Sequence, residues 1–451
     1  MELLTAIVSA VNAFVWGPPM LVLILGTGIY LQFRLRLLPV RRIPAGLRMV
    51  WASRHPDADA EGQITPYAAL MKALAATVAT GNMVGVATAI ALGGPGAIFW
   101  MWVTALVGMA TKYAEVLLAV HYREVDDKGE HVGGPMYAIK NGLGPQWRWL
   151  GTLFAVFGGL AGFGIGNMVQ SNSIAHALED SFGLPPWLVG LTLAVLTGLV
   201  LLGGIQRIAN VAKRLVPTMC ISYIAVALLV LLLYADRIPE ALGIILTHAF
   251  NPMAATGGFA GATIMMAIRY GVSRGIFSNE AGMGTAGIVQ AAGKTKNAAQ
   301  SGLIGMMGTF IDTIVICTMT ALVVMVTGVW DSGATGAVMT ATAFGTALPG
   351  FGQYFVALAL AVFAFSTILG WSYYGEKCWE YLGGTVTRTP YRLAWTLFVP
   401  LGAVAQLDFV WLVAETLNAF MAFPNLISLV LLSPVVVRVT NDYFNAKALE
   451  A

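Results

Sequence analysis

Long apolar runs separated by short polar connections dominate the sequence. Eleven of these runs approach or exceed the roughly 20 apolar residues that a transmembrane helix needs. None shows the alternation typical of a membrane β-strand, so the pattern predicts membrane helices. The predicted spans cover residues 5–33, 67–92, 97–121, 149–177, 186–203, 210–235, 257–281, 301–329, 353–378, 392–407 and 410–437.

Basic residues concentrate in alternate connections between these spans. With eleven spans, nearly all of them fall on one side, whereas Arg237 is the main exception on the other. Basic residues stay on the cytoplasmic side of a membrane, so we expect the N-terminus outside and the C-terminus in the cytoplasm. The first run is too long for a signal-peptide core, and we expect a retained helix.

The composition supports a membrane protein. Apolar residues make up 58% of the 451 positions and charged residues only 10%, against about 25% charged in soluble domains. The three cysteines (Cys220, Cys317 and Cys378) are far apart, and the five histidines show no metal-ligand spacing. These features argue against a typical soluble enzyme, a disordered chain and a disulfide-stapled domain. No basic run points to nucleic acid.

Two predicted spans contain glycine together with hydrogen-bonding side chains at bilayer depth. The first stretch is 79–85 in the second span, and the other is 270–280 in the seventh. Unwound backbone survives in a membrane only where it is buried or lines a cavity. We expect helix breaks that form a binding site, although simple kinks without a ligand remain the alternative.

The spacing of the two breaks suggests an internal repeat. They lie five spans apart, and five is odd, so a second five-helix unit would be inverted relative to the first. Inverted repeats with broken helices in matching positions indicate a secondary transporter. We expect repeats at 67–235 and 257–437, an extra N-terminal helix at 1–33 and a cytoplasmic tail at 438–451. The linker 34–66 could hold a surface helix near residues 43–51, or it could be solvated.

The chemistry of such a site follows from the breaks. The N-terminus of a half-helix presents free N–H groups to a carboxylate. Unwound carbonyl groups can bind a cation. A zwitterion beside a small metal ion would therefore use the free N–H groups and the carbonyl groups together. An ion channel would need carbonyl rings or a charged pore, and a membrane enzyme would need clustered acid, base or metal groups. Neither is evident in the spans.

Several long motifs resemble the alanine/glycine:cation symporter family. The resemblance covers nearly the whole chain and rests on residues 80–82, 93–97, 99–102, 108–115, 274–282 and 370–376. It implies an all-α integral membrane protein of the leucine-transporter type, with a five-plus-five inverted repeat after one additional helix. It also implies sodium-coupled, sometimes proton-coupled, symport of alanine or glycine across a prokaryotic plasma (inner) membrane. Sodium would be the coupling ion, with no cofactor and no obligatory protein partner.

The resemblance further suggests which residues form the site. The substrate residues would offer N–H groups, a side-chain amide, carbonyl groups and two aromatic walls. The N–H groups would come from Thr80, Gly81 and Asn82, and the side-chain amide from Gln170. The carbonyl groups would be those around Gly271 and Ser273, and the aromatic walls would be Phe277 and Trp371. Sodium would lie between the carbonyl groups of Ala75 and Val78 and the hydroxyl groups of Ser366 and Thr367.

Asp312 is an acid inside the eighth predicted span. Charged groups at this depth are costly and are therefore often functional. Asp312 could carry a coupling proton, or it could be a structural acid paired with Arg269 or Arg274. Arg274 and Glu280 are also candidates for a cytoplasmic gate pair, while Lys112 and Glu115 have the spacing of a structural pair on one helix.

Overall fold

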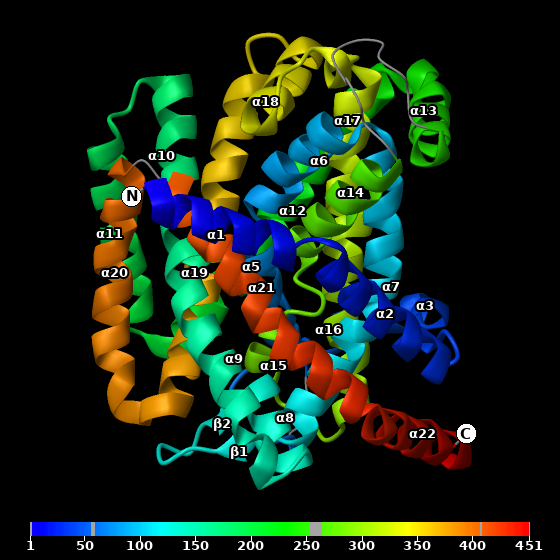
Figure 1. The fold of residues 1–451 in the computed structure, drawn as a ribbon, viewed down its shortest axis with the longest axis vertical. Coiled ribbons are helices and arrows are strands. Elements are labelled where there is room, and N and C mark those ends of the chain that lie inside the picture. The colour runs from blue at the N-terminus through cyan, green and yellow to red at the C-terminus, as the bar shows by residue number, and fades with distance from the viewer. Residues whose placement is uncertain (1, 56–58, 252–263, 406–407, 451) are drawn as a thin grey trace.

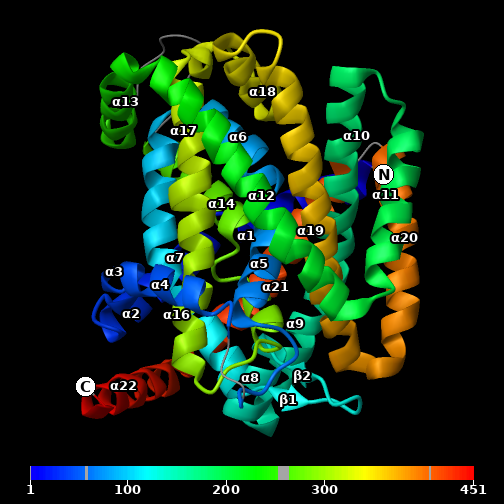
Figure 2. The same cartoon turned by 180° about the vertical axis from the view of Figure 1, so that it is seen from behind.

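The computed structural model describes residues 2–55, 59–251, 264–405 and 408–450, and helices make up almost all of it. Figures 1 and 2, seen from opposite sides, show most of the long helices side by side along the long axis, with a small hairpin at one end. The hairpin consists of β1 (Glu124–Val125) and β2 (His131–Val132), which pair antiparallel. We call this end of the molecule the hairpin end.

The α-helices are α1 (Glu2–Val15), α2 (Pro18–Arg34), α3 (Leu38–Arg41), α4 (Ile43–Ala52), α5 (Pro66–Thr77), α6 (Val86–Gly93), α7 (Gly96–His121), α8 (Pro135–Gly142), α9 (Arg148–Ala161), α10 (Val169–Phe182), α11 (Pro186–Leu201), α12 (Gly204–Leu233), α13 (Ile238–Phe250), α14 (Ile264–Asn279), α15 (Thr285–Gln290), α16 (Ala298–Thr309), α17 (Thr318–Val326), α18 (Gly336–Ala347), α19 (Gly352–Gly383), α20 (Arg388–Val404), α21 (Asp408–Leu431) and α22 (Ser433–Glu450). Three π-helical segments are η1 (Gly81–Gly85), η3 (Gly162–Met168) and η5 (Phe310–Cys317). Short 3-10 turns are η2 (Pro145–Trp147), η4 (Ala235–Arg237), η6 (Val329–Asp331) and η7 (Thr385–Thr387).

Many of these helices could cross a membrane. Within the described residues, seven helical segments are long and apolar enough, and one further pair qualifies as a bent span. The structure thus confirms an all-α, multi-pass membrane protein, whereas the number eleven stays a prediction. The seventh predicted span begins at residues 257–263, which lie outside the described residues, and α14 has only 16 residues.

The first apolar run forms two helices where the sequence predicted one. Trp16 and Gly17 separate α1 from α2, because Pro18 and Pro19 lack the N–H groups that would continue a helix from the preceding turn. α1 lies across α21 (Figure 1), where Trp16 donates a hydrogen bond to the Glu415 carbonyl over 3.0 Å.

The predicted surface helix is present as α4. Gly46 packs directly over Met307 of α16, so this helix is attached to the core of the protein and is not a solvated linker. Trp51, near its end, is largely exposed. The position of α4 relative to a bilayer surface stays a prediction.

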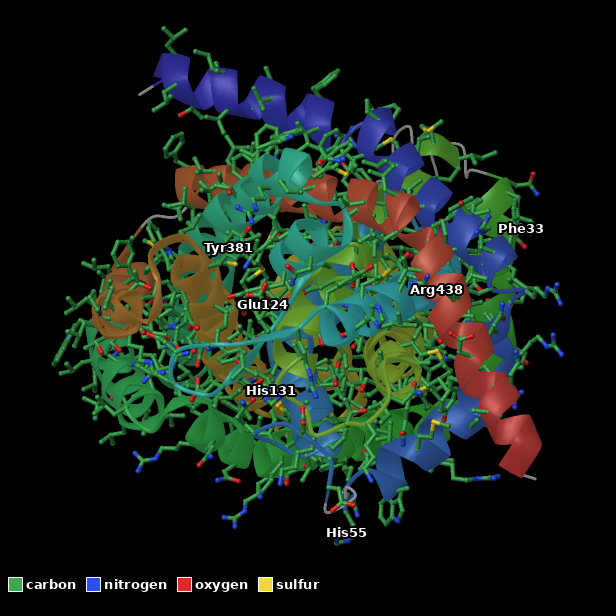
Figure 3. All side chains as sticks on the ribbon, turned by 90° about the horizontal axis from the view of Figure 1, so that it is seen from below. Phe33, His55, Glu124, His131, Tyr381 and Arg438 are labelled. Carbon is green, nitrogen blue, oxygen red and sulfur yellow. The ribbon has the colours of Figure 1, made fainter. Side chains whose placement is uncertain are left out.

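Several predicted cytoplasmic connections meet at the hairpin end, which Figure 3 views directly. Arg123 donates to the carbonyl groups of Ala291, Gly293 and Glu61 over 3.0–3.2 Å. These connections therefore share one end of the molecule, as the charge pattern predicted.

The chain before α5 is hydrogen-bonded to the chain after α15. The N–H of Gln63 donates to the Ala292 carbonyl over 2.9 Å, and the N–H of Lys294 donates to the Ile64 carbonyl over 2.8 Å. The hairpin end of α5 is thus attached to the segment that follows α15.

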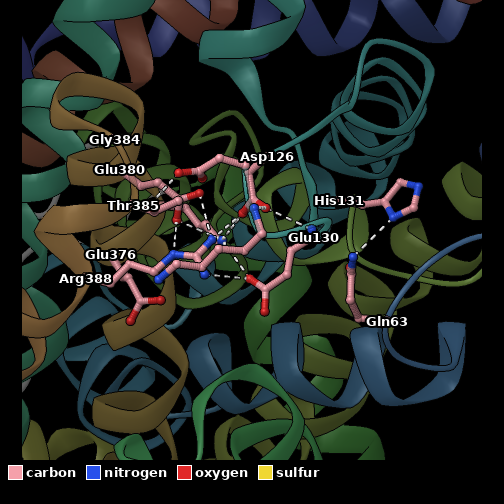
Figure 4. A network of polar contacts seen from close by, with 12 residues as sticks. Gln63, Asp126, Glu130, His131, Glu376, Glu380, Gly384, Thr385 and Arg388 are labelled. Atoms are coloured by element: carbon pink, nitrogen blue, oxygen red, sulfur yellow. Dashed lines mark hydrogen bonds and ion pairs between the residues drawn. The ribbon is translucent and has the colours of Figure 1, made fainter.

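A buried ionic cluster fixes the hairpin to α19 and α20 (Figure 4). Arg388 forms ion pairs with Asp126, with Glu130 at 2.9 Å and with Glu380 at 2.7 Å. Lys377 donates to Glu380 over 2.8 Å. Several mutually paired charges offset one another's desolvation, so the cluster holds the hairpin in a defined position.

Candidate functional site

The second predicted span is broken where the sequence predicted. α5 ends at Thr77, and the next helical segment departs from its direction by 54°. Val78 has an extended backbone, with φ −75° and ψ 92°. The side-chain oxygen of Asn82 caps the break by accepting from the N–H of Ala79 over 2.8 Å.

The predicted position of the break in the seventh span is wrong. α14 is continuous from Ile264 to Asn279, so the carbonyl groups of Gly271 and Ser273 belong to a regular helix. Gly271 is needed for close packing, because a Cβ there would collide with the Ala97 carbonyl on α7. The irregular backbone begins at Glu280, the last residue of the predicted stretch, and ends at Gly284. Positive φ angles at Glu280 (55°) and Gly284 (77°) turn the chain into α15.

The second-span break touches the last turn of α14, directly before the second break. A Cβ on Gly81 would lie 2.9 Å from the Cα of Ser278, so glycine is required for this approach. Next to Gly81 in the sequence, Asn82 donates to one carboxylate oxygen of Asp312 over 2.8 Å. Ser278 donates to the other oxygen, also over 2.8 Å. Asp312 therefore joins the second-span break to the last turn of α14 through its two oxygens.

Only neutral groups hydrogen-bond to the Asp312 carboxylate within the described residues. Thr313 supplies a third donor, a hydroxyl at 2.8 Å, and Asp312 itself is completely buried. The predicted pairing with Arg269 or Arg274 is wrong, since Arg274 pairs with Glu415 at 3.1 Å. The reason is geometric: the π-helical segment η5 carries Asp312 on the side that faces the breaks, and α21 brings Glu415 to Arg274.

The predicted gate pair of Arg274 and Glu280 is wrong as well. Glu280 is buried and accepts from the indole N–H of Trp371 over 2.8 Å and from the hydroxyl of Thr285 over 2.5 Å. The predicted structural pair of Lys112 and Glu115 is confirmed, with 3.9 Å between Nζ and Oε2.

Gln170 lies across from the second-span break. Its amide nitrogen is 3.4 Å from the hydroxyl of Thr80 and donates to the Ile165 carbonyl over 3.0 Å. The Gln170 Oε1 atom is buried without a hydrogen-bond partner among the described residues. A buried polar oxygen of this kind is available to a bound donor such as an ammonium group. The N–H of Asn82, in contrast, is already used by the Ala79 carbonyl at 3.2 Å.

The two predicted aromatic walls lie on different sides of the breaks. Phe277 comes within 3.9 Å of a Cβ placed on Gly85 and stacks on Trp411. Ser273 and Phe277 line a small pocket of about 70 Å³ beside α1 and α21. Trp371 is buried directly against Gly166 in η3, where only glycine leaves room for the indole.

Three of the four predicted sodium residues are in contact. The hydroxyl oxygens of Ser366 and Thr367 on α19 each lie 3.0 Å from the Ala75 carbonyl oxygen. Each hydroxyl also lies within hydrogen-bond distance of the Phe363 carbonyl of its own helix, at 2.8 and 3.2 Å. Both side chains are buried. Val78, the fourth residue, lies one turn further on at the end of α5. Hydroxyl and carbonyl oxygens at a helix end are the hard ligands that a monovalent cation binds.

Sequence reasoning missed Ser278, Thr313 and the three π-helical segments. Ser278 lay inside the predicted break without a role, and Thr313 follows Asp312 directly. η1 contains Asn82, η5 contains Asp312, and η3 ends two residues before Gln170. π-Helical turns widen a helix locally and often mark functional positions, but no simple residue pattern predicts them.

Comparison with known proteins identifies the family. The sequence profile described as the sodium:alanine symporter family matches residues 1–450. The chain is 50% identical to the sodium/alanine symporter AgcS of Methanococcus maripaludis over 452 residues, which covers 99% of this chain and 98% of that protein. It is 37% identical to the probable sodium/glutamine symporter GlnT of Bacillus subtilis, over 99% and 92% of the two chains.

The fold also matches a solved transporter. The structure of MhsT in complex with L-phenylalanine superposes with a TM-score of 0.58 over 84% of this chain and 98% of that chain. The two sequences are only 14% identical, so this match shows the fold alone. Together with the family profile and the close relatives, it shows that the chain is a multi-pass transporter, not an enzyme, and that it belongs to the sodium:alanine symporter family.

Proposed function

We propose that this protein carries alanine, and glycine as a second small substrate, into the cell together with sodium. The name of the AgcS relative supports alanine and sodium, whereas the more distant relative GlnT is named as a probable sodium/glutamine symporter. The observation that carries the proposal is the contact of the second-span break with the end of α14, at Gly81 and Ser278, together with hydroxyl groups that converge on the Ala75 carbonyl.

The substrate would bind at the second-span break. The N–H groups of Thr80 and Gly81 would receive its carboxylate, and the unpaired oxygen of Gln170 would accept from its ammonium group. Because Gly271 and Ser273 lie in a regular helix, the carbonyl groups expected from them would come instead from the irregular backbone after Asn279. Phe277 and Trp371 would limit the side chain to a small group.

Sodium would bind between α5 and α19. Its ligands would be the carbonyl groups of Ala75 and Val78 and the hydroxyl groups of Ser366 and Thr367. Both hydroxyl groups already contact the Ala75 carbonyl, so small rotations would turn their lone pairs toward an ion. Transport would follow from alternating access, with the repeats at 67–235 and 257–437 moving around this site. The N-terminus would be outside a prokaryotic inner membrane and the C-terminus inside.

Proton coupling is a second candidate because of Asp312. A buried carboxylate with three neutral donors is costly unless a proton or a nearby cation balances its charge. Under sodium coupling, the positive charge of the ion would provide this balance.

Uptake into liposomes tests the proposal. Purified protein should accumulate radiolabelled alanine only with an inward sodium gradient, and excess unlabelled glycine should compete. Accumulation driven by a proton gradient without sodium would favour the second candidate. A sodium current that does not depend on alanine would contradict symport and favour a channel.

A further inference from the structure

The chain that leaves α2 carries an unusual set of charges. Residues 34–54, which we call the arginine segment, run from the end of α2 through α3 and α4. The segment contains six arginines and no lysine, aspartate or glutamate. The arginines are Arg34, Arg36, Arg41, Arg42, Arg48 and Arg54. Like charges at this spacing repel one another unless anions balance them.

The described residues supply no such anion. All six arginine side chains are exposed, and within the described part of the chain none of them forms an ion pair or a hydrogen bond. The described acids that follow in the sequence face other groups, since Asp59 lies 3.6 Å from Lys296 and Glu61 lies 3.7 Å from His131. The arginine segment is therefore a cationic surface that the described residues leave unbalanced.

α4 combines charge with an exposed aromatic ring. One face of this helix is attached to the protein, because Gly46 packs over Met307 of α16. The opposite face is exposed and carries Arg48 and Trp51, and Trp51 is 68% exposed. The guanidinium group of Arg54 lies 3.5 Å from the ring centre of Trp51. Basic and apolar groups on one exposed face are typical of a helix at a membrane surface.

The turn between α2 and α3 shows the same combination. Phe33, labelled in Figure 3, is 76% exposed, and Leu37 is exposed beside Arg36. α22 lies on the same side of the molecule, where the guanidinium group of Arg42 is 4.9 Å from the ring centre of Phe444. A free phosphate ion would balance the charges but would leave these apolar groups in water. A phospholipid would satisfy both.

The arginine segment also follows a membrane span directly. Leu3–Arg34 is one of the segments that are long and apolar enough to cross a membrane. Clusters of about four to eight basic residues next to a span, or on an amphipathic helix, bind anionic lipids. Arginine fits a phosphate group better than lysine does, because its planar guanidinium group offers two parallel donors.

We propose that the arginine segment binds the headgroups of anionic phospholipids at the membrane surface of the hairpin end. The guanidinium groups would bind the phosphate oxygens, while Phe33, Leu37 and Trp51 would lie among the upper parts of the acyl chains. This binding would balance the six charges and would fix α4 at the bilayer surface.

Quenching of Trp51 fluorescence by brominated lipids tests this proposal. Purified full-length protein, freed of lipid in a neutral detergent, is titrated with brominated phosphatidylglycerol or brominated phosphatidylcholine, which differ in headgroup charge. The difference between the wild type and Trp51→Phe isolates the signal of Trp51, and this exposed position should tolerate the change. We expect phosphatidylglycerol to bind about tenfold more tightly or better, and added salt should reduce this preference.

Substitutions separate charge from shape. Arg41→Gln combined with Arg48→Gln should weaken phosphatidylglycerol binding about 25-fold, or about fivefold for each arginine, and should leave phosphatidylcholine binding unchanged. Arg41→Lys combined with Arg48→Lys should retain most of the binding. Lys140→Gln is the matched control, because it removes a positive charge that already pairs with Glu124 near the hairpin. This control should bind lipid like the wild type.

Two results on the wild-type protein would overturn the proposal without any arginine variant. Equal binding of the two lipids would show that the arginines do not recognise the headgroup charge. Displacement of phosphatidylglycerol by an equal concentration of inorganic phosphate would show a site for free anions. An unchanged lipid preference in the folded double glutamine variant would overturn it as well.

Discussion

The side-chain amide of Asn82 donates a hydrogen bond of 2.8 Å to the carboxylate of Asp312. The second oxygen of that carboxylate accepts from Ser278, at the end of α14. One acid on η5 therefore joins the second-span break to the end of α14, two segments that lie almost 200 residues apart in the sequence. Anything that changes the charge of Asp312 should change how the two breaks fit together.

Asp312→Asn tests the need for this charge. The amide keeps one oxygen for Asn82 and can donate to the hydroxyl groups of Ser278 and Thr313, so the protein should still fold. Without a negative charge near the site, we expect sodium affinity to fall about tenfold, the effect of roughly 1.4 kcal/mol. Thr313→Ala removes one neutral hydrogen bond and should have a smaller effect. Equal effects of the two variants on sodium titrations of uptake would contradict a role for the charge.

The contact between Gly81 and Ser278 predicts a sharp difference between two neighbouring glycines. Gly81→Ala places a methyl group 2.9 Å from the Cα of Ser278 and should push the breaks apart, reducing alanine uptake at least tenfold. Gly85→Ala meets only the edge of Phe277 at 3.9 Å and should retain most of the uptake. Similar activities of two equally expressed variants would show that the close approach is unimportant.

Gln170 and Thr80 are predicted to bind the substrate. Gln170→Ala removes the unpaired Oε1 atom, and we expect the KM for alanine to rise about tenfold, consistent with loss of a hydrogen bond to a charged group. Thr80→Val, a change of similar shape, should also raise KM. Concentration series of radiolabelled uptake measure this directly. Wild-type KM values in both variants would contradict the proposal that Gln170 and Thr80 bind the substrate.

Thr367 is predicted to bind sodium. Thr367→Ala removes a hydroxyl that lies 3.0 Å from the Ala75 carbonyl, so uptake should need several times more sodium. Ser372→Ala is the matched control, because Ser372 is also buried on α19 but, among the described residues, its hydroxyl bonds only to the Leu369 carbonyl of its own helix. An unchanged sodium titration for Thr367→Ala would refute the assignment.

The stability of the hairpin region should depend on pH through His131. Burial and the nearby Arg123 lower the pKa of His131 below its usual value of about 6.5. The unfolded chain therefore takes up a proton before the folded one as the pH falls. The contribution of neutral His131 to stability should be fully present above about pH 6.5 and should be lost as the pH drops toward the folded-state pKa. Thermal unfolding in detergent between pH 8 and pH 5 measures this, and His131→Asn should flatten the dependence.

The sequence predicted much of the fold because membrane helices leave a strong pattern. Span positions and the shared end of the basic connections follow from hydropathy and charge alone. The break at 79–85 was found because glycine and asparagine interrupt an otherwise apolar run. The sequence places the seventh-span break too early, because Gly271 and Gly275 look like helix breakers, whereas Gly271 is required for packing on α7.

The partners of the buried charges were beyond prediction. The pairing of Arg274 with Glu415 and of Trp371 with Glu280 depends on how distant helices cross. Hydropathy contains no information on those crossings. The shift of Asp312 toward the breaks depends on a π-helical turn, which arises from packing between helices and leaves no periodic signal.

The backbone bonds between Gln63 and Ala292 and between Lys294 and Ile64 have a mechanical consequence. They tie the hairpin-side half of one broken span to the chain that leaves the other. A movement of α5 would then also move α15. The hairpin-side segments of both broken spans would therefore move together when the site opens toward the hairpin end.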